Sequence, residues 1–169
     1  MKISLLGYMG AGKSTLGKAL ARRWTLPFID LDEAFQAHTG LSVAETLRQK
    51  GEIYFRRAEH QLLEELLPRP RFVLALGGGT PCYYQHMEAL NAHTHTVYLQ
   101  RSVKQLAERL RHQRAERPLL ESVAEEQLSE FIAKHLFERR AFYESAQLTL
   151  PQRLIDTEAQ IEYLEEHLL

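Results

Sequence analysis

The feature that most constrains the fold is the stretch GYMGAGKST at residues 7–15, which directly follows the apolar run ISLL. Its first eight residues fit GxxxxGK[ST], a loop whose backbone N–H groups cradle phosphates. Such a loop joins a buried strand to a helix, and the helix directs its positive N-terminus at the phosphates. The pattern therefore predicts a strand at 2–6, a helix at 13–24 and a nucleotide-binding loop between them.

Short apolar runs alternate with longer stretches of helical period along the rest of the chain. Strands are predicted at 2–6, 27–29, 71–76, 94–99 and 153–156. Helical segments are predicted at 13–24, from the capping box at 42–45, from 51 to 67, near 83–90, and at 102–113, 122–146 and 157–169. This order predicts an α/β fold, a three-layer sandwich in which helices cover both faces of a five-stranded parallel sheet. Ligands bind beyond the carboxyl ends of such strands, where GYMGAGKST, DLD and GGGT all fall.

Length and charge limit the classes of function. A chain of 169 residues with 44% hydrophobic residues fits a single domain, 1–169. The net charge of −1 provides no basic field for nucleic acid or a membrane surface, so neither is an expected partner. No apolar run approaches the ~18 residues that span a bilayer. The single cysteine, Cys82, cannot form an internal disulfide, which indicates a reducing, cytoplasmic location. We expect a monomer.

The phosphate loop supplies the first candidate site residues. Lys13 is expected against the β- and γ-phosphates, and the Ser14 hydroxyl is expected to bind Mg²⁺. The alternative is a glycine-rich turn with an exposed lysine. The residues expected to hold ATP here are Gly10, Ala11, Gly12, Lys13, Ser14 and Thr15.

Two carboxylates close the second predicted strand. Asp30 and Asp32 would point to the same side if the backbone is still extended there. One could help to hold hydrated Mg²⁺, and the other could accept a hydrogen bond from a substrate hydroxyl. The alternative is an ordinary acidic helix start, because aspartate is a common N-cap.

Glycines and arginines complete the candidate set. Gly77, Gly78 and Gly79 end the third predicted strand, which suits a close approach of a ligand to the backbone. Arg117 lies in a charged segment between two predicted helices, where it could close over the transferring phosphoryl group. Arg56 and Arg139 could bind a carboxylate, although periodicity does not distinguish Arg56 from Arg57. The alternative for all these arginines is a solvated helix face.

The ordered set GYMGAGKST, DLD, GEIYFRRAE, LGGGT, RPLL and RRAFY resembles the shikimate kinase family across nearly the whole chain. The resemblance implies transfer of the ATP γ-phosphoryl group to the 3-hydroxyl of shikimate, with Mg²⁺, in aromatic amino acid biosynthesis. It also implies a P-loop, nucleoside-monophosphate-kinase-like fold with sheet order 2-3-1-4-5 and a mobile lid at about 112–122.

The resemblance also implies roles for individual residues. Asp32 would contact the shikimate hydroxyls and assist deprotonation, and Asp30 would lie near Mg²⁺. Arg56 and Arg139 would hold the substrate carboxylate. The remaining matches are Gly77–Gly79 on the substrate side, Arg117 at the phosphates and Arg109 near adenine. The segment 153–169 departs from the family, because it lacks the basic, proline-containing turn that often borders adenine.

Two other readings remain open at this point. One is a P-loop kinase for another small molecule, such as gluconate or a nucleoside monophosphate. The other is a nucleotide-dependent regulatory module, which would need no acceptor pocket. The combination of DLD with Arg56, the glycine triplet and Arg139 favours a small polyhydroxy carboxylate as the acceptor.

Overall fold

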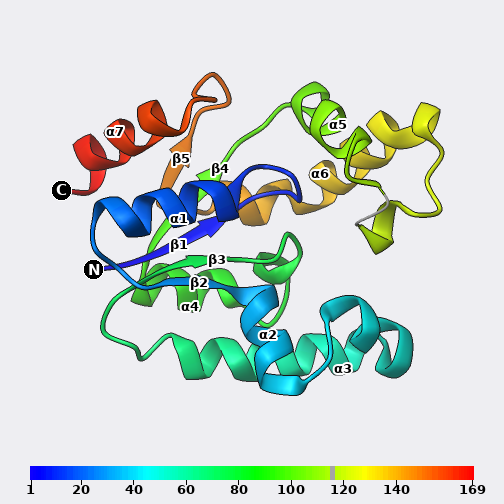
Figure 1. Ribbon diagram of the computed structural model, residues 1–169, viewed down its shortest axis with the longest axis horizontal. Coiled ribbons are helices and arrows are strands. Elements are labelled where there is room, and N and C mark those ends of the chain that lie inside the picture. The colour runs from blue at the N-terminus through cyan, green and yellow to red at the C-terminus, as the bar shows by residue number, and fades with distance from the viewer. Residues whose placement is uncertain (115–116) are drawn as a thin grey trace.

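A computed structural model describes residues 1–114 and 117–169 of the chain. Its centre is a five-stranded sheet of order β2-β3-β1-β4-β5, in which every neighbouring pair is parallel (Figure 1). The strands are β1 (Lys2–Leu6), β2 (Phe28–Asp30), β3 (Phe72–Ala75), β4 (His95–Leu99) and β5 (Leu148–Leu150). The predicted α/β class and the strand order are confirmed.

The phosphate loop leaves the sheet from its central strand. Leu5 of β1 pairs with Ala75 on one side and with Val97 on the other. Ile3, Leu5 and Leu6 are fully buried. A strand that is covered on both faces reads as a continuous apolar run, which is why ISLL shows no alternation.

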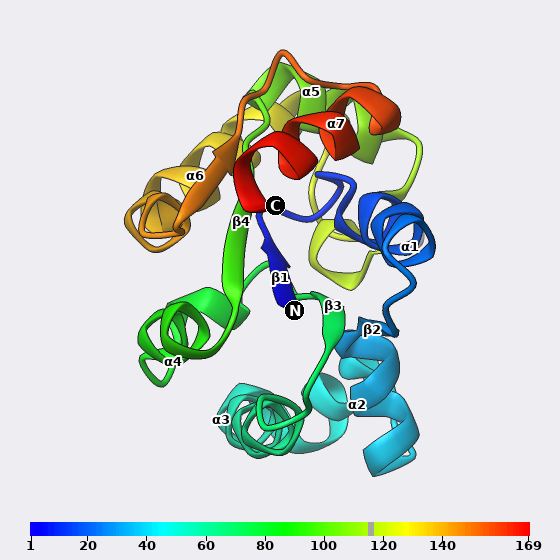
Figure 2. The ribbon, with the colours of Figure 1, turned by 90° about the vertical axis from the view of Figure 1, so that its left-hand side faces the viewer.

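Helices form the outer layers of the sandwich. They are α1 (Lys13–Arg23), α2 (Leu31–Thr39), α3 (Val43–Leu66), α4 (His86–His93), α5 (Val103–Arg111), α6 (Leu128–Glu144) and α7 (Thr157–Leu168). Helices α1 and α7 lie on one side of the sheet, and α4 and α6 lie on the other (Figure 2). In the described part of the chain, no helix has the length and apolar character needed to cross a membrane.

Capping boxes are present at two of the predicted helix starts, those of α3 and α5. The Ser42 hydroxyl accepts a hydrogen bond from the Glu45 N–H at 3.1 Å, and the Ser42 N–H donates to the Glu45 carboxylate at 2.8 Å. Ser102 caps α5 in the same way. Gly51 interrupts α3 with φ 83° and ψ 172°, a conformation that is accessible almost only to glycine.

Three predicted boundaries are wrong. The last strand is Leu148–Leu150. Residues 153–156 belong to the turn and irregular segment that follow it, and Asp156 at its end caps α7 by accepting from the Ala159 N–H at 3.0 Å. The long helix α6 begins at Leu128 and not at the Ser122 box, because the 3₁₀ turn Glu125–Gln127 intervenes. Helix α4 begins at His86, because Tyr84 and Gln85 have φ near 50° and cannot continue a right-handed helix.

The predicted lid, 112–122, connects α5 to α6, and residues 115–116 of it lie outside the described part of the chain. Its second half contains the 3₁₀ turn Pro118–Leu120, in which Leu120 is fully buried. In the described part of this segment, Leu120 therefore ties the backbone to the core. The mobility of the lid stays a prediction.

Candidate functional site

A cavity of about 660 Å³ opens beyond the carboxyl ends of the strands. It is lined by residues of the phosphate loop, the DLD segment, α3, the glycine triplet, the lid and α6. The predicted site residues in its wall are Gly10, Ala11, Gly12, Lys13, Ser14, Thr15, Asp30, Asp32, Arg56, Gly77, Gly78, Gly79, Arg109, Arg117 and Arg139. Every residue chosen from the sequence thus contributes to one cavity, while the individual roles stay predictions.

The phosphate loop depends on two glycines in the left-handed region. Gly10 has φ 78°, and a Cβ atom there would lie 2.9 Å from Leu110 Cδ2. Gly12 has φ 99° and forms the N-cap of α1 without a side chain. Any other residue at either position would be strained, because both lie in the left-handed region. Since glycine has no Cβ atom, a ligand can also approach the backbone N–H groups of the loop closely.

Lys13 is folded back over this loop. Its Nζ donates to the carbonyl oxygens of Gly7 at 2.8 Å and Tyr8 at 2.9 Å. Burial lowers the Lys13 pKa to about 8, although the charge of Asp32 opposes this shift. The ammonium group is therefore cationic at neutral pH, and it is held where an anionic ligand of the loop would meet it.

The DLD segment does not continue as a strand, so the expected extended spacing of its carboxylates is wrong. Asp30 caps α2, and its Oδ1 accepts from the N–H groups of Asp32 at 3.1 Å and Glu33 at 3.4 Å. Its other oxygen, Oδ2, accepts from the Ser14 hydroxyl at 2.6 Å. The helix cap expected as the alternative is therefore present, and the second oxygen of Asp30 faces Ser14; the place of Asp30 at Mg²⁺ stays a prediction.

Asp32 lies one residue inside α2 and faces the glycine triplet. A Cβ atom added at Gly77 would lie 3.2 Å from Asp32 Oδ1. Burial, together with the nearby Asp30 and Glu59 carboxylates, raises the Asp32 pKa to about 6, and Lys13 and Arg117 partly offset the rise. A carboxylate with this pKa is suited to accept a proton near neutral pH.

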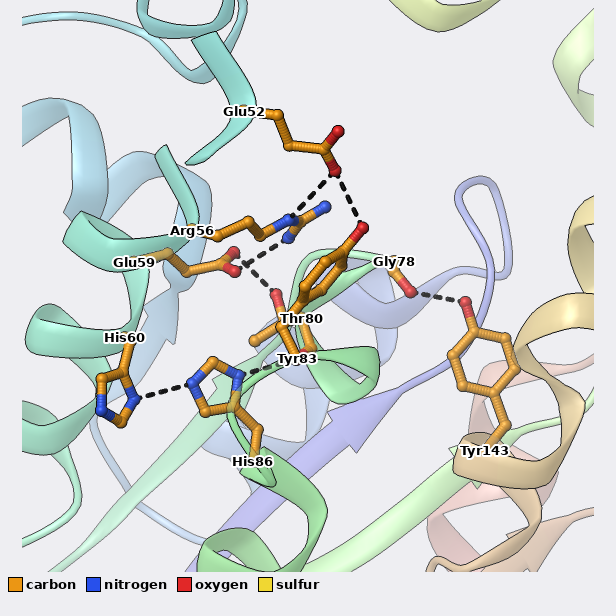
Figure 3. A network of polar contacts seen from close by, with 9 residues as sticks. All are labelled: Glu52, Arg56, Glu59, His60, Gly78, Thr80, Tyr83, His86 and Tyr143. Atoms are coloured by element: carbon orange, nitrogen blue, oxygen red, sulfur yellow. Dashed lines mark hydrogen bonds and ion pairs between the residues drawn. The ribbon is translucent and has the colours of Figure 1, made fainter. Parts of the chain in front are cut away.

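Glycines at 78 and 79 leave room for two arginines. A Cβ atom at Gly78 would lie 3.3 Å from Arg139 Nη1, and one at Gly79 would collide with Arg56 Nη2. The Tyr143 hydroxyl donates to the Gly78 carbonyl at 2.6 Å and so joins α6 to this loop (Figure 3). The structure thus brings Arg56 and Arg139 to the same glycine loop, although they are 83 positions apart in the chain.

Arg56 is held by a second residue that the sequence analysis did not single out. Arg56 Nη1 donates to Glu59 Oε1 at 2.9 Å, and Glu59 Oε2 accepts from the Thr80 hydroxyl at 2.8 Å (Figure 3). The Glu59 side chain is only 2% exposed. Its signal was the three-residue spacing from Arg56, which puts both side chains on one face of a helix. Arg57 points to solvent, which resolves the choice between the two arginines.

The opposite end of the cavity is also basic. Arg109 Nη1 donates to the Gly10 carbonyl at 3.1 Å, and Arg117 Nη2 donates to Gln113 Oε1 at 3.2 Å. The lining residues that were not predicted from the sequence include Arg101, Ile155, Thr157 and Gln160. No local sequence pattern predicts these residues. They lie after β4 and at the start of α7, two segments that are distant in sequence and become neighbours only because β5 pairs with β4.

Comparisons with known proteins agree with this geometry. The family described as shikimate kinase matches residues 9–168. The shikimate kinase of Flavobacterium johnsoniae is 44% identical over 163 residues, which cover 94% of this chain and 95% of that protein. A crystal structure of shikimate kinase from Bacteroides thetaiotaomicron has a TM-score of 0.92 at 38% identity and covers 99% of this chain and 98% of its own. The shikimate kinase of Acinetobacter baumannii in complex with shikimate has a TM-score of 0.85 at 30% identity, covering 99% and 90%.

Proposed function

The chain belongs to the shikimate kinase family, and from this premise we propose how its residues carry out the reaction. The protein is an ATP-dependent kinase that transfers the γ-phosphoryl group to the 3-hydroxyl of shikimate. The reaction belongs to aromatic amino acid biosynthesis. In phosphoryl transfer the protein contributes mainly positioning and charge stabilisation.

At the nucleotide end, the backbone of the phosphate loop holds the phosphates of ATP and Lys13 neutralises charge on the β- and γ-oxygens. Arg117 approaches the γ-phosphate from the lid, and Arg109 lies toward the adenine. The donors for Mg²⁺ fit a hard cation, because the Ser14 hydroxyl and the Asp30 carboxylate oxygen lie 2.6 Å apart at the mouth of the loop. The bound ion would neutralise charge that develops on the phosphoryl oxygens.

At the acceptor end, Arg56 and Arg139 hold the carboxylate of shikimate through charge-assisted hydrogen bonds. Asp32 accepts a hydrogen bond from the attacking hydroxyl and takes its proton as the new O–P bond forms, while the bond between the γ-phosphorus and the bridging oxygen of ATP breaks and ADP leaves with that oxygen. The glycine triplet lets the ring of the substrate approach the backbone. The observation that carries this proposal is the single cavity that has Lys13 and Ser14 at one end and Asp32, Arg56 and Arg139 at the other.

A coupled assay of ADP release tests the proposal. With Mg²⁺ and ATP present, addition of shikimate should start ADP release with one shikimate 3-phosphate formed per ADP. Gluconate and a nucleoside monophosphate should not start it. ADP release that ignores shikimate and responds to either of these compounds would overturn the proposal.

Four further properties complete the proposal. The protein acts as one domain, 1–169, with the segment 112–122 closing over bound nucleotide. It works as a monomer in the cytoplasm, which agrees with its single cysteine.

A further inference from the structure

The ring of Tyr83 lies against the guanidinium group of Arg56, outside the wall of the cavity. Arg56 Cζ is 4.2 Å from the centroid of the Tyr83 ring. The Tyr83 hydroxyl donates to Glu52 Oε1 at 2.8 Å, and the same oxygen lies 3.8 Å from Arg56 Nε (Figure 3). Tyr83 follows the 3₁₀ turn Thr80–Cys82, so one short loop supplies both the glycine triplet and this ring.

A ring in this position restrains an arginine without using its donors. The aromatic face attracts the cation, while the N–H groups in the guanidinium plane stay free to bind a carboxylate. Other neighbours restrain the edges of the same group. Glu59 holds Nη1 at 2.9 Å, and Nη2 lies so close to Gly79 that a Cβ atom there would not fit. The guanidinium group, whose side chain is 14% exposed, is therefore confined on several sides.

We propose that Tyr83 is a positioning residue for the acceptor substrate. Its ring sets the plane of the Arg56 guanidinium group, and the hydrogen bond to Glu52 holds the ring in place. A long arginine side chain loses conformational freedom when it binds a ligand, and a side chain that is already confined loses less. The inference rests on the proposed function, because it takes Arg56 as the residue that receives the substrate carboxylate.

Replacement of the ring should therefore weaken shikimate binding and leave the chemical step unchanged. In Tyr83→Leu, the Kd for shikimate measured by calorimetry without nucleotide should rise about 3- to 30-fold, the range of one cation–π contact. The KM for shikimate should rise with it. The KM for ATP, and kcat at saturating shikimate, should stay within about twofold of wild type. Unchanged shikimate affinity in this variant would overturn the inference.

Two matched variants separate positioning from a general effect on the loop. Tyr83→Phe keeps the ring and loses only the hydroxyl, so it should restore most of the affinity that Tyr83→Leu loses. Tyr84→Leu makes the same change one residue later, where the ring stacks on His60 with centroids 4.5 Å apart; the described rings that lie over the Arg56 guanidinium group are those of Phe55 and Tyr83. That variant should bind shikimate like wild type. Equal losses in Tyr83→Leu and Tyr84→Leu would show a loop defect and overturn the inference.

A double variant separates this inference from the proposed function. On an Arg56→Ala background, Tyr83→Leu should cause no further loss, because the ring acts only through Arg56. An additional loss would overturn the inference. If Arg56→Ala alone leaves shikimate affinity unchanged, the proposed place of Arg56 fails, and the inference fails with it. If Arg56→Ala weakens binding and Tyr83→Leu does not, only the inference fails.

Discussion

At the scale of single residues, the site holds two groups whose pKa values are displaced toward each other. Burial lowers the Lys13 pKa to about 8 and raises the Asp32 pKa to about 6. In the ligand-free protein both groups are therefore charged between about pH 6 and 8. The cation faces the phosphate end and the anion faces the acceptor end, as a phosphoryl transfer requires.

Removal of the loop cation should slow the reaction strongly. Lys13→Ala should lower kcat at least about 10²-fold, the effect of losing one group that stabilises transition-state charge. Lys18→Ala, an exposed lysine on the same helix, is the control and should keep near-normal turnover. Both variants should keep the wild-type circular dichroism spectrum. Near-normal turnover in Lys13→Ala would remove this lysine from the mechanism.

Asp32 should limit stability while it supports turnover. Its folded pKa, about 6, lies above the ordinary 3.8, so the folded state binds more protons than the unfolded state between about pH 4 and 6. Stability therefore falls as pH rises through that window, and the cost persists at pH 7. Asp32→Asn should lower kcat about 10²-fold or more, yet raise the free energy of unfolding at pH 7 by at most about 1 kcal/mol, because the residue is partly exposed and solvent screens its charge. Urea titrations should show no gain at pH 4. A loss of stability at pH 7 would contradict the prediction.

The acidic limb of the pH–rate profile provides a second check on Asp32. In wild type, kcat/KM for shikimate should rise through about pH 6, where the pKa of Asp32 lies. The residual activity of Asp32→Asn should not show this limb. If the acidic limb is still present in Asp32→Asn, it arises from the titration of another group, and the prediction is contradicted.

The two arginines of the acceptor end should affect one ligand only. Arg56→Ala and Arg139→Ala should each weaken shikimate binding about tenfold or more, because each loses a charge-assisted hydrogen bond of roughly 1.5–3 kcal/mol. ATP binding should stay close to wild type in both. Arg57→Ala is the matched control, because that side chain is exposed beside Arg56. Calorimetric titrations should give the Kd of each ligand for each variant. Unchanged shikimate affinity in both variants would contradict the prediction and indicate that these arginines lie on solvated helix faces.

At the scale of elements, we expect the connection from α5 to α6 to be the part of the fold that responds to nucleotide. Leu120 ties it to the core, and Arg117 lines the cavity and contacts Gln113. We predict that this segment closes over bound phosphates by turning about the buried Leu120, as lids do.

The lid arginine should therefore act on turnover more than on acceptor binding. Arg117→Ala should lower kcat at least about tenfold, while the Kd for shikimate without nucleotide stays within about twofold. Arg111→Ala is the control, because Arg111 is exposed and pairs with Glu125 at 3.3 Å. Calorimetry that shows lost shikimate affinity in Arg117→Ala would place this arginine in the acceptor pocket.

At the scale of the whole molecule, large exposed apolar side chains are distributed over separate elements. They include Ile53 on α3, Phe137 on α6 and Leu169 at the chain end. Single exposed side chains are normal for a monomeric protein and do not form a docking surface. We therefore expect sedimentation equilibrium to return the chain mass of 19.6 kDa at micromolar concentration. A mass near twice this value would contradict the prediction of a monomer.

Local signals decided much of the fold. The strand and helix around the phosphate loop, and the starts of α3 and α5 at Ser42 and Ser102, depend on residues close together in sequence. Such features follow from backbone sterics and short-range hydrogen bonds, so the sequence predicts them. Alternation of strands and helices predicted the parallel sheet, and the family resemblance supplied the sheet order and the predicted site residues that line the cavity.

The same kind of signal was wrong where long-range packing competes with it. The box at Ser122 does not start a helix, and the three-residue strand β5 exists because Leu148 pairs with Val97 of β4. Strand pairing adds hydrogen bonds from a distant segment, which no local pattern contains.

By itself, therefore, the sequence determined the chemistry of the protein: a phosphate loop, a pair of aspartates, a glycine triplet and arginines suited to phosphates and a carboxylate. Periodicity did not separate Arg56 from Arg57, and the resemblance gave Arg56 only as an expectation; the tertiary structure decided which of the two lines the cavity. It turned Arg56 rather than Arg57 toward the cavity, and it placed Glu59 and Tyr83 against that guanidinium group. The physical reason is that the surroundings of a side chain depend on which distant segments the sheet order brings beside it. Contacts of this kind cannot be predicted from any single stretch of the chain.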